Sequence, residues 1–203
     1  MLDASMMRFV LGSLPPSPAR VLEVGAGDGE LAGALTSAGY DVVAIDPASK
    51  VPSVRPVALQ ELHEPRGSFD AAVAVLSMHH VEPLTESCRR LGEIVRPAGA
   101  LVLDEIDFDC FDERAARWWL DHHEPVKADT SSPAEIVNFL RHHCHMLSSV
   151  AAALEEWFEL GPPTRGPYLY RWELSPTLRD TEVELIAAGQ LPATGARIVG
   201  ARR

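Results

Sequence analysis

Short apolar runs alternate with amphipathic stretches along the first half of the chain. Apolar runs at 21–24, 42–45, 69–76 and 100–103 predict buried strands. Apolar residues at helical spacing predict helices over 31–38 and 84–95, and a shorter leading helix over 6–14 that stops at Pro15 and Pro16. Strands that alternate with helices are typical of an α/β protein with a doubly wound, parallel sheet.

The pattern changes in the second half of the chain. From about residue 112 to residue 160 it is helical throughout, which predicts an insertion of helices at about 110–160. Beyond Gly161, an alternating run at 168–174 predicts a strand, 181–188 a helix and 196–200 a last short strand. We therefore expect a single domain over residues 1–203, with an inserted helical lid.

Charge and composition exclude several classes of function. The 203 residues include 18 Lys and Arg against 29 Asp and Glu, a net charge of −11, so the basic surface that nucleic-acid binding requires is not expected. Three widely spaced cysteines predict neither a disulfide framework nor a zinc knuckle. The first residues do not resemble a signal peptide, and no 18 apolar residues run together, so we expect a cytoplasmic protein without a membrane span.

A glycine-rich turn follows the first predicted strand, where residues 23–29 read Glu-Val-Gly-Ala-Gly-Asp-Gly. The dinucleotide fingerprint requires its third glycine at position 30, where this chain has Glu30. A carboxylate in the first turn of a helix would repel a pyrophosphate. A P-loop is excluded because no Gly-Lys-Ser/Thr follows. The loop therefore favours a ligand without phosphates, with an ordinary turn as the alternative.

This loop resembles the first motif of the class I S-adenosylmethionine (SAM)-dependent methyltransferases, an acidic residue followed by Gly-x-Gly-x-Gly. Segments 44–47, 69–76 and 91–103 extend the resemblance over about residues 19–105. It implies a Rossmann-like sheet of seven mostly parallel strands, the last one antiparallel, with helices on both faces. It also implies that the cofactor is S-adenosyl-L-methionine.

The resemblance further implies positions for the parts of SAM. Glu23 is expected near the methionine end, and Asp46 is expected to accept hydrogen bonds from both ribose hydroxyls, unless it merely ends a strand before Pro47. Gln60, or Glu61 in its place, follows the position where the family contacts adenine. The residues expected to contact SAM are Glu23, Gly25, Ala26, Gly27, Gly29, Asp46, Pro47, Leu59, Gln60, Val75 and Leu76.

The methyl acceptor is expected beyond the carboxyl ends of the strands, against loops 77–80 and 104–109. His79 and His80 are candidate general bases because imidazole titrates near neutral pH, although a histidine that only packs is the alternative. Glu105, Trp118, His122 and Tyr168 are expected to contact the acceptor. An aromatic roof of Trp118, Trp119, Trp157, Tyr168, Tyr170 and Trp172 would suit an aromatic or hydrophobic small molecule, with core packing as the alternative.

No metal site is expected. His142 and His145 stand three residues apart rather than at the four-residue spacing of helical zinc sites, and the fourth strand of the family ends here without a carboxylate. The sequence thus predicts a methyltransferase that acts by in-line displacement on oxygen or nitrogen of a small-molecule acceptor. A SAM-binding protein without catalysis and a NAD-dependent oxidoreductase are the alternatives, and whether the chain acts as a homodimer is left open.

Overall fold

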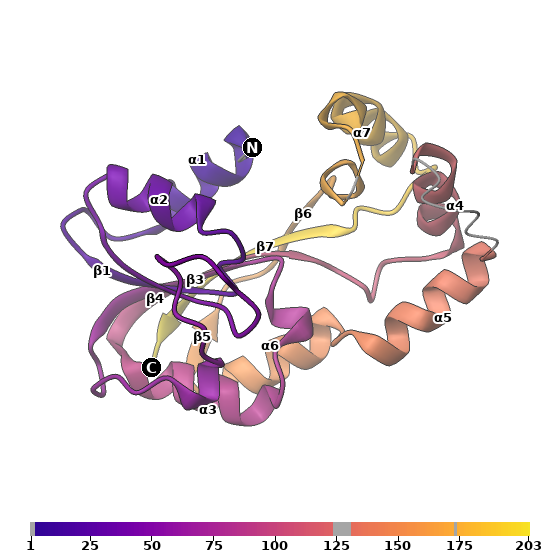
Figure 1. Cartoon of the computed structure of the whole chain (residues 1–203). Coiled ribbons are helices and arrows are strands. Elements are labelled where there is room, and N and C mark those ends of the chain that lie inside the picture. The colour runs from indigo at the N-terminus through magenta and orange to yellow at the C-terminus, as the bar shows by residue number, and fades with distance from the viewer. Residues whose placement is uncertain (1–2, 124–130, 173) are drawn as a thin grey trace.

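In the computed structural model, residues 3–123, 131–172 and 174–203 are described, and one mixed sheet runs through them (Figure 1). The strands are β1 (Arg20–Val24), β2 (Asp41–Ile45), β3 (Phe69–Val75), β4 (Val95–Ile106), β5 (Phe158–Leu160), β6 (Thr164–Gly166) and β7 (Gly195–Arg202). The helices are α1 (Ala4–Ser13), α2 (Glu30–Ser37), α3 (Leu84–Ile94), α4 (Glu113–His122), α5 (Pro133–His143), α6 (Leu147–Glu155) and α7 (Arg179–Ala187).

The sheet has seven strands in the order β2-β1-β3-β4-β7-β5, with β6 paired to β7. Strands β2, β1, β3 and β4 are mutually parallel, whereas β7 runs antiparallel to β4. The predicted fold, a doubly wound Rossmann-like sheet with an antiparallel last strand, is therefore confirmed. The segment between β2 and β3 adds only one parallel bridge, from Ile45 to Arg55.

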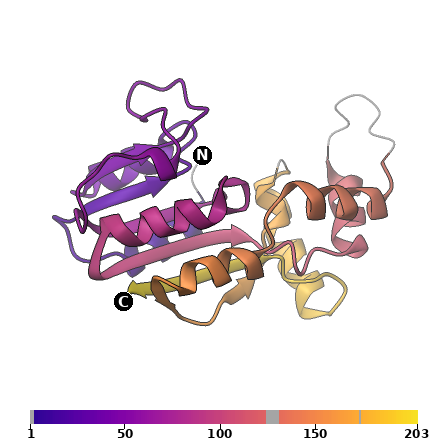
Figure 2. The same ribbon diagram turned by 90° about the horizontal axis from the view of Figure 1, so that it is seen from below.

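Helices cover both faces of this sheet, with α1 and α2 on one side and α3 and α6 on the other (Figures 1 and 2). Val10 and Leu35 are buried on the first side, and Leu91 and Leu154 on the second, and all four are inaccessible to solvent. Burial of such side chains supplies most of the driving force that fixes the layers. Within the described residues, no helix has the length and apolar character that crossing a membrane requires.

The predicted helical insertion divides into two parts. Helices α4 and α5 pack together beyond the carboxyl ends of the parallel strands, but α6 lies against the sheet beside α3 (Figure 2). A Cβ atom at Gly92 of α3 would come within 2.5 Å of the Trp157 ring, so Trp157 belongs to this outer layer and not to a lid. The prediction of unbroken helix up to residue 160 is wrong, because β5 ends the stretch; residues 124–130 of it lie outside the described residues.

The strand predicted at 168–174 is also wrong. Residues Leu169–Arg171 form a short 3-10 helix instead, and position 173 lies outside the described residues. The carboxylate of Glu182, fully buried on α7, accepts hydrogen bonds from the backbone N–H groups of Tyr168, Leu169 and Tyr170 at 2.7–3.0 Å. These three donors are thereby withdrawn from any strand ladder, which alternating hydrophobicity could not reveal.

We expect Glu182→Ala to lower the free energy of unfolding by about 3 kcal/mol, because three buried N–H groups lose their acceptor. Chemical denaturation followed by circular dichroism measures this change. Glu184→Ala, an exposed carboxylate on the same helix, is the matched control and should change stability by less than about 0.5 kcal/mol. Equal stability of the two variants would contradict the role given to Glu182.

Candidate cofactor and acceptor site

The glycine loop connects β1 to α2 and lies against the end of β2. Gly25, Gly27 and Gly29 all have positive φ, at 72°, 52° and 78°, a backbone conformation that glycine adopts without steric cost. The N–H groups of Gly25 and Ala26 both donate to the carbonyl oxygen of Ile45, at 2.9 and 3.0 Å. The loop is thus held over the carboxyl end of β2 as it turns into α2.

Asp46 follows directly on β2 and faces this loop. One oxygen of its carboxylate accepts a hydrogen bond from the N–H of Gly27 at 3.0 Å, and the other accepts one from Ala48 at 2.8 Å. The Asp46 carboxylate therefore holds the glycine loop in place, and it lies at the position where the resemblance predicts the ribose of SAM.

A cavity of about 520 Å³ opens between the glycine loop, the end of β2 and the segments that follow Val57 and Val75. Six of the residues expected to contact SAM line it together: Gly25, Asp46, Pro47, Leu59, Gln60 and Leu76. The walls are mostly apolar, with the Asp46 carboxylate as the charged group nearest the loop, and the volume suits a small-molecule ligand. A bare backbone at Gly25, a carboxylate for two hydroxyls and apolar walls for an adenine ring together fit SAM.

The other five expected cofactor residues lie outside the lining of this cavity. Gly27 and Gly29 shape the loop, Ala26 packs with Ala32 beneath it, and Val75 packs against the core on the α1 side. Glu23 points into the same side of the sheet and is 4% exposed. Burial raises the pKa of its carboxyl to about 8, partly offset by a backbone hydrogen bond from Ala32, and one of its oxygens has no hydrogen-bond partner in the described part of the chain.

The loop after β3 is held from below by Glu105. This carboxylate is 1% exposed; one oxygen accepts the N–H groups of Ser77 and Met78 at 2.8 and 2.7 Å, and the other lies 2.8 Å from Nδ1 of His79. Glu105 is therefore buried beneath the loop, and the expected contact with an acceptor is replaced by a positioning role. Leu76, where the chain enters the loop, has a positive φ of 53°, the kind of backbone strain that clusters at functional sites.

The imidazole rings of His79 and His80 lie side by side, with their centroids 4.2 Å apart. His79 is buried on Glu105, whereas His80 is exposed and lies on the wall of the cofactor cavity. Partial burial of the ring, and then the neighbouring His79, lower the pKa of His80, while Glu105 opposes the shift. His80 therefore carries a neutral imidazole at neutral pH, the form that can accept a proton.

A second cavity, of about 230 Å³, meets the first at Leu76 and His80, which line both. Its remaining walls come from His79, from the end of β4 and the residues after it, from α5 and from Trp172. They include the rings of Phe108, Phe139 and Trp172. The full lining is Leu76, His79, His80, Ile106, Phe108, Phe139, Leu140, His143, Cys144 and Trp172. We call it the aromatic cavity.

Three residues expected at the acceptor lie elsewhere. Trp118 faces a separate depression between α4 and α7, where it lies beside Leu185 and Leu191. The His122 ring packs against Trp118 at a tilt of 34°, and its Nδ1 lies 2.8 Å from the carbonyl oxygen of Trp118. Tyr168 is 1% exposed and lines a third cavity. Helical spacing predicted the helix that carries Trp118 but could not say which face would meet α7.

Sequence reasoning also missed walls of the aromatic cavity. Phe108 lies in a loop that was expected at the acceptor without being singled out. Phe139 and His143 stand four residues apart on α5 and stack with ring centroids 4.0 Å apart. That spacing, together with an exposed fraction of 59% for Phe139, marks the helix face that looks into the cavity.

No group of three or more His, Cys, Asp or Glu side chains that could hold a metal ion occurs among the described residues. His142 and His143 each bond through Nδ1 to a backbone carbonyl oxygen of the preceding turn, at 2.7 and 2.8 Å. Asp104, which lies inside β4 rather than after it as expected, and Asp107, just beyond β4, are paired with arginines.

Comparison with known proteins adds independent findings. A family model described as a methyltransferase domain matches residues 3–160. The ubiquinone biosynthesis O-methyltransferase of Xanthomonas axonopodis pv. citri is 30% identical over 121 residues, which cover 52% of this chain and 51% of that protein. The chain thus spans about half the length of the curated relatives it matches.

Two solved structures share the fold. A putative methyltransferase from an antibiotic biosynthesis pathway of Anabaena variabilis superposes with a TM-score of 0.64 at 19% identity, over 98% of this chain and 97% of that one. The 1,6-didemethyltoxoflavin-N1-methyltransferase of Burkholderia thailandensis gives 0.55 at 17% identity, over 98% and 75%. With the family match over most of its length and a cavity that fits the cofactor, the chain belongs to the class I SAM-dependent methyltransferases.

Proposed function

We propose that this protein transfers the methyl group of SAM to an oxygen or nitrogen atom of a small, largely apolar acceptor bound in the aromatic cavity. The observation that carries the proposal is that Leu76 and His80 line both cavities, so ligands in the two would meet there. In-line displacement requires the attacking atom and the methyl group to be held in contact and aligned.

The residues of the chain have two tasks in this proposal. SAM supplies an electrophilic methyl group on a sulfonium that is already a good leaving group. His80, neutral at neutral pH, accepts the proton that the attacking oxygen or nitrogen loses, while His79 is fixed on Glu105 beside it. Phe108, Phe139 and Trp172 provide apolar contact area and keep water from the reacting atoms.

The class of acceptor rests on further support. The names of two similar proteins specify an O-methyltransferase of ubiquinone biosynthesis and an N1-methyltransferase of 1,6-didemethyltoxoflavin. The net charge of −11 disfavours a nucleic-acid substrate. An aromatic or hydrophobic small molecule suits walls of this composition.

The activity is tested by following the transfer of label from methyl-labelled SAM. The acceptors are a panel of small phenols, amines and heteroaromatic compounds, and a small-molecule cell extract. We expect a labelled product from the native protein and a rate about 100-fold lower from His80→Ala, since general-base catalysis contributes at least that much. His63→Ala, a histidine outside both cavities, is the control. SAM binding without any labelled product would favour a non-catalytic SAM-binding protein instead.

We expect Asp46→Ala to weaken SAM binding by about 10- to 100-fold, because a charge-assisted pair to the ribose hydroxyls is worth about 1.5–3 kcal/mol. Calorimetric titration with SAM and with S-adenosylhomocysteine measures the loss, with NAD as the control ligand. Asp41→Ala removes the same charge from the exposed start of β2 and should bind SAM as the native protein does. Native-like affinity in Asp46→Ala would refute the ribose assignment.

A further inference from the structure

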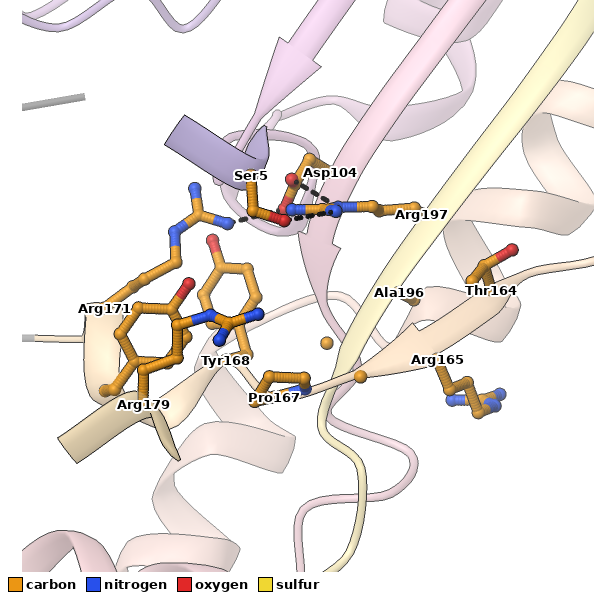
Figure 3. A pocket seen from close by; sticks show the side chains of 13 residues that line it. Ser5, Asp104, Thr164, Arg165, Pro167, Tyr168, Arg171, Arg179, Ala196 and Arg197 are labelled. Atoms are coloured by element: carbon orange, nitrogen blue, oxygen red, sulfur yellow. Dashed lines mark hydrogen bonds and ion pairs between the residues drawn. The ribbon is translucent and has the colours of Figure 1, made fainter. Parts of the chain in front are cut away.

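A third cavity, of about 180 Å³, lies where β4, β6, β7 and the start of α1 meet, and it shares no lining residue with the cofactor cavity or the aromatic cavity. Its walls carry four arginines and one carboxylate (Figure 3). We call it the arginine cavity; its polar side chains are Ser5, Asp104, Thr164, Arg165, Tyr168, Tyr170, Arg171, Arg179 and Arg197.

A buried carboxylate holds two of the arginines in place. Asp104, 1% exposed, lies 2.8 Å from Nη1 of Arg171 through one oxygen and 3.0 Å from Nε of Arg197 through the other. Figure 3 shows these three side chains converging beside Ser5, whose hydroxyl oxygen accepts a further bond from Arg197 at 3.0 Å. The Asp104 carboxylate thus faces the guanidinium groups of Arg171 and Arg197. Asp3 does not line the cavity, but the charges of the same two guanidinium groups lower the pKa of its carboxyl.

Arg179 adds a third positive group from the first residue of α7. Arg179 forms an ion pair of 3.0 Å with the neighbouring Asp180, whose side chain is 88% exposed, so solvent weakens that interaction. Arg165 contributes less, because its guanidinium pairs with Asp107 and points away from the others in Figure 3. The cavity therefore offers guanidinium donors from Arg171, Arg179 and Arg197.

Tyr168 supplies the second, independent observation. It is 1% exposed, and its hydroxyl oxygen has no hydrogen-bond partner among the described residues. Burial raises the pKa of this phenol well above its usual value, so the hydroxyl remains a hydrogen-bond donor. The guanidinium of Arg171 lies 4.6 Å from the centre of its ring. Buried hydroxyl groups without a partner are rare in folded proteins, and an acceptor on a ligand would satisfy this one.

We propose that the arginine cavity binds an oxyanion, the carboxylate or phosphate group of a small molecule. Planar guanidinium groups match both anions, and the volume admits such a group with little beyond it. The four arginines share their charge with nearby carboxylates, so an anion is favoured by the guanidinium N–H groups that line the cavity and by the Tyr168 hydroxyl, which lacks a partner within the described part of the chain, rather than by net charge. The site is defined without reference to methyl transfer.

The proposal is tested by titrating the protein with inorganic phosphate and with acetate. Binding is measured by calorimetry and by thermal unfolding, with chloride at equal ionic strength as the control anion. We expect saturable binding of at least one of them and an affinity at least tenfold lower for Arg179→Gln. Arg89→Gln removes the same charge from the surface of α3 and should bind as the native protein does. The absence of saturable binding, or equal affinities for Arg179→Gln and Arg89→Gln, would overturn the proposal.

Tyr168→Phe tests the hydroxyl separately, because removing a buried hydroxyl without a partner should leave the melting temperature without ligand unchanged or higher. We expect its affinity for the anion to fall severalfold. Native affinity in this variant would exclude the hydroxyl from the site. These measurements contain no SAM, so they can succeed or fail independently of the methyltransferase activity.

The labelling assay distinguishes an anionic group of the acceptor from a free anion as the occupant of the cavity. In this assay, the methylation rate of each carboxylic acid in an acceptor panel is compared with that of its amide. If the cavity holds the anionic group of the acceptor itself, the acid is methylated faster than its amide and phosphate competes with it. If the cavity holds a free anion, phosphate changes the methylation of uncharged acceptors without competing. Arg179→Gln should abolish either effect.

Discussion

Replacing Gly25 by alanine should weaken SAM binding at least about 100-fold and destabilise the fold. The new Cβ would stand 2.2 Å from Cβ of Ser77, an approach that only backbone movement can relieve, and φ at this position is +72°. Overpacking and the left-handed conformation together cost about 3 kcal/mol. Movement of Ser77 would also break its hydrogen bond to the carbonyl oxygen of Val24, at 2.7 Å, and shift a wall of the cofactor cavity.

Calorimetry with S-adenosylhomocysteine and chemical denaturation measure the two effects of Gly25→Ala, and we expect an affinity at least about 100-fold lower. Gly189→Ala is the matched control, because φ is +70° there but no atom lies within 4 Å of the added Cβ. It should lose about 1–2 kcal/mol of stability and keep native affinity. Adding Ser77→Gly to Gly25→Ala should restore part of the binding, and failure of both the loss and the rescue would refute the close approach.

Local sequence signals were sufficient for the cofactor half of the site. A strand, a glycine-rich turn and a helix within about twenty residues fix where the backbone of Gly25 lies, because a parallel sheet leaves few ways to connect them. Asp46 was found in the same way, as the first residue after the neighbouring strand. Both residues lie on the wall of one cavity, together with Leu59 and Gln60 from the next connection.

The acceptor half was not predictable from local signals. Its walls depend on which face of α5 turns toward the loop after β3, and the apolar spacing of a helix does not select its partner. The six aromatic residues assigned to one roof are distributed over the core instead: Trp157 packs on α3, Tyr168 lines the arginine cavity, and Trp172 alone of the six lines the aromatic cavity.

Buried carboxylates that bind backbone N–H groups were the least predictable feature. The sequence predicted contact with the acceptor for Glu105 and assigned no role to Glu182, yet each is buried and holds a segment of irregular backbone. Their partners are 12–14 and 27–28 residues away in the chain, so no local pattern marks them. In this fold they supply the hydrogen bonds that a strand ladder would otherwise provide.

Glu105→Ala should therefore be the most destabilising change in the loop after β3. It leaves the buried N–H groups of Ser77 and Met78 without an acceptor and separates His79 from its partner at 2.8 Å. At about 1–3 kcal/mol for each buried donor, we expect a loss of about 4 kcal/mol in the free energy of unfolding, close to a 1000-fold change in the folding equilibrium. Chemical denaturation at neutral pH measures it.

Two further variants separate this positioning role from simple loss of a charge. Glu86→Ala removes an exposed carboxylate from α3 and should change stability by less than about 0.5 kcal/mol. Glu105→Gln keeps one carbonyl oxygen for the two N–H groups and should retain most of the stability, but its amide meets Nδ1 of His79 as a donor and forces the other tautomer on the imidazole. If the free energy of unfolding of Glu105→Gln is as low as that of Glu105→Ala, the charge of the carboxylate holds the loop. If neither variant differs in stability from Glu86→Ala, Glu105 does not position the loop that joins the two cavities.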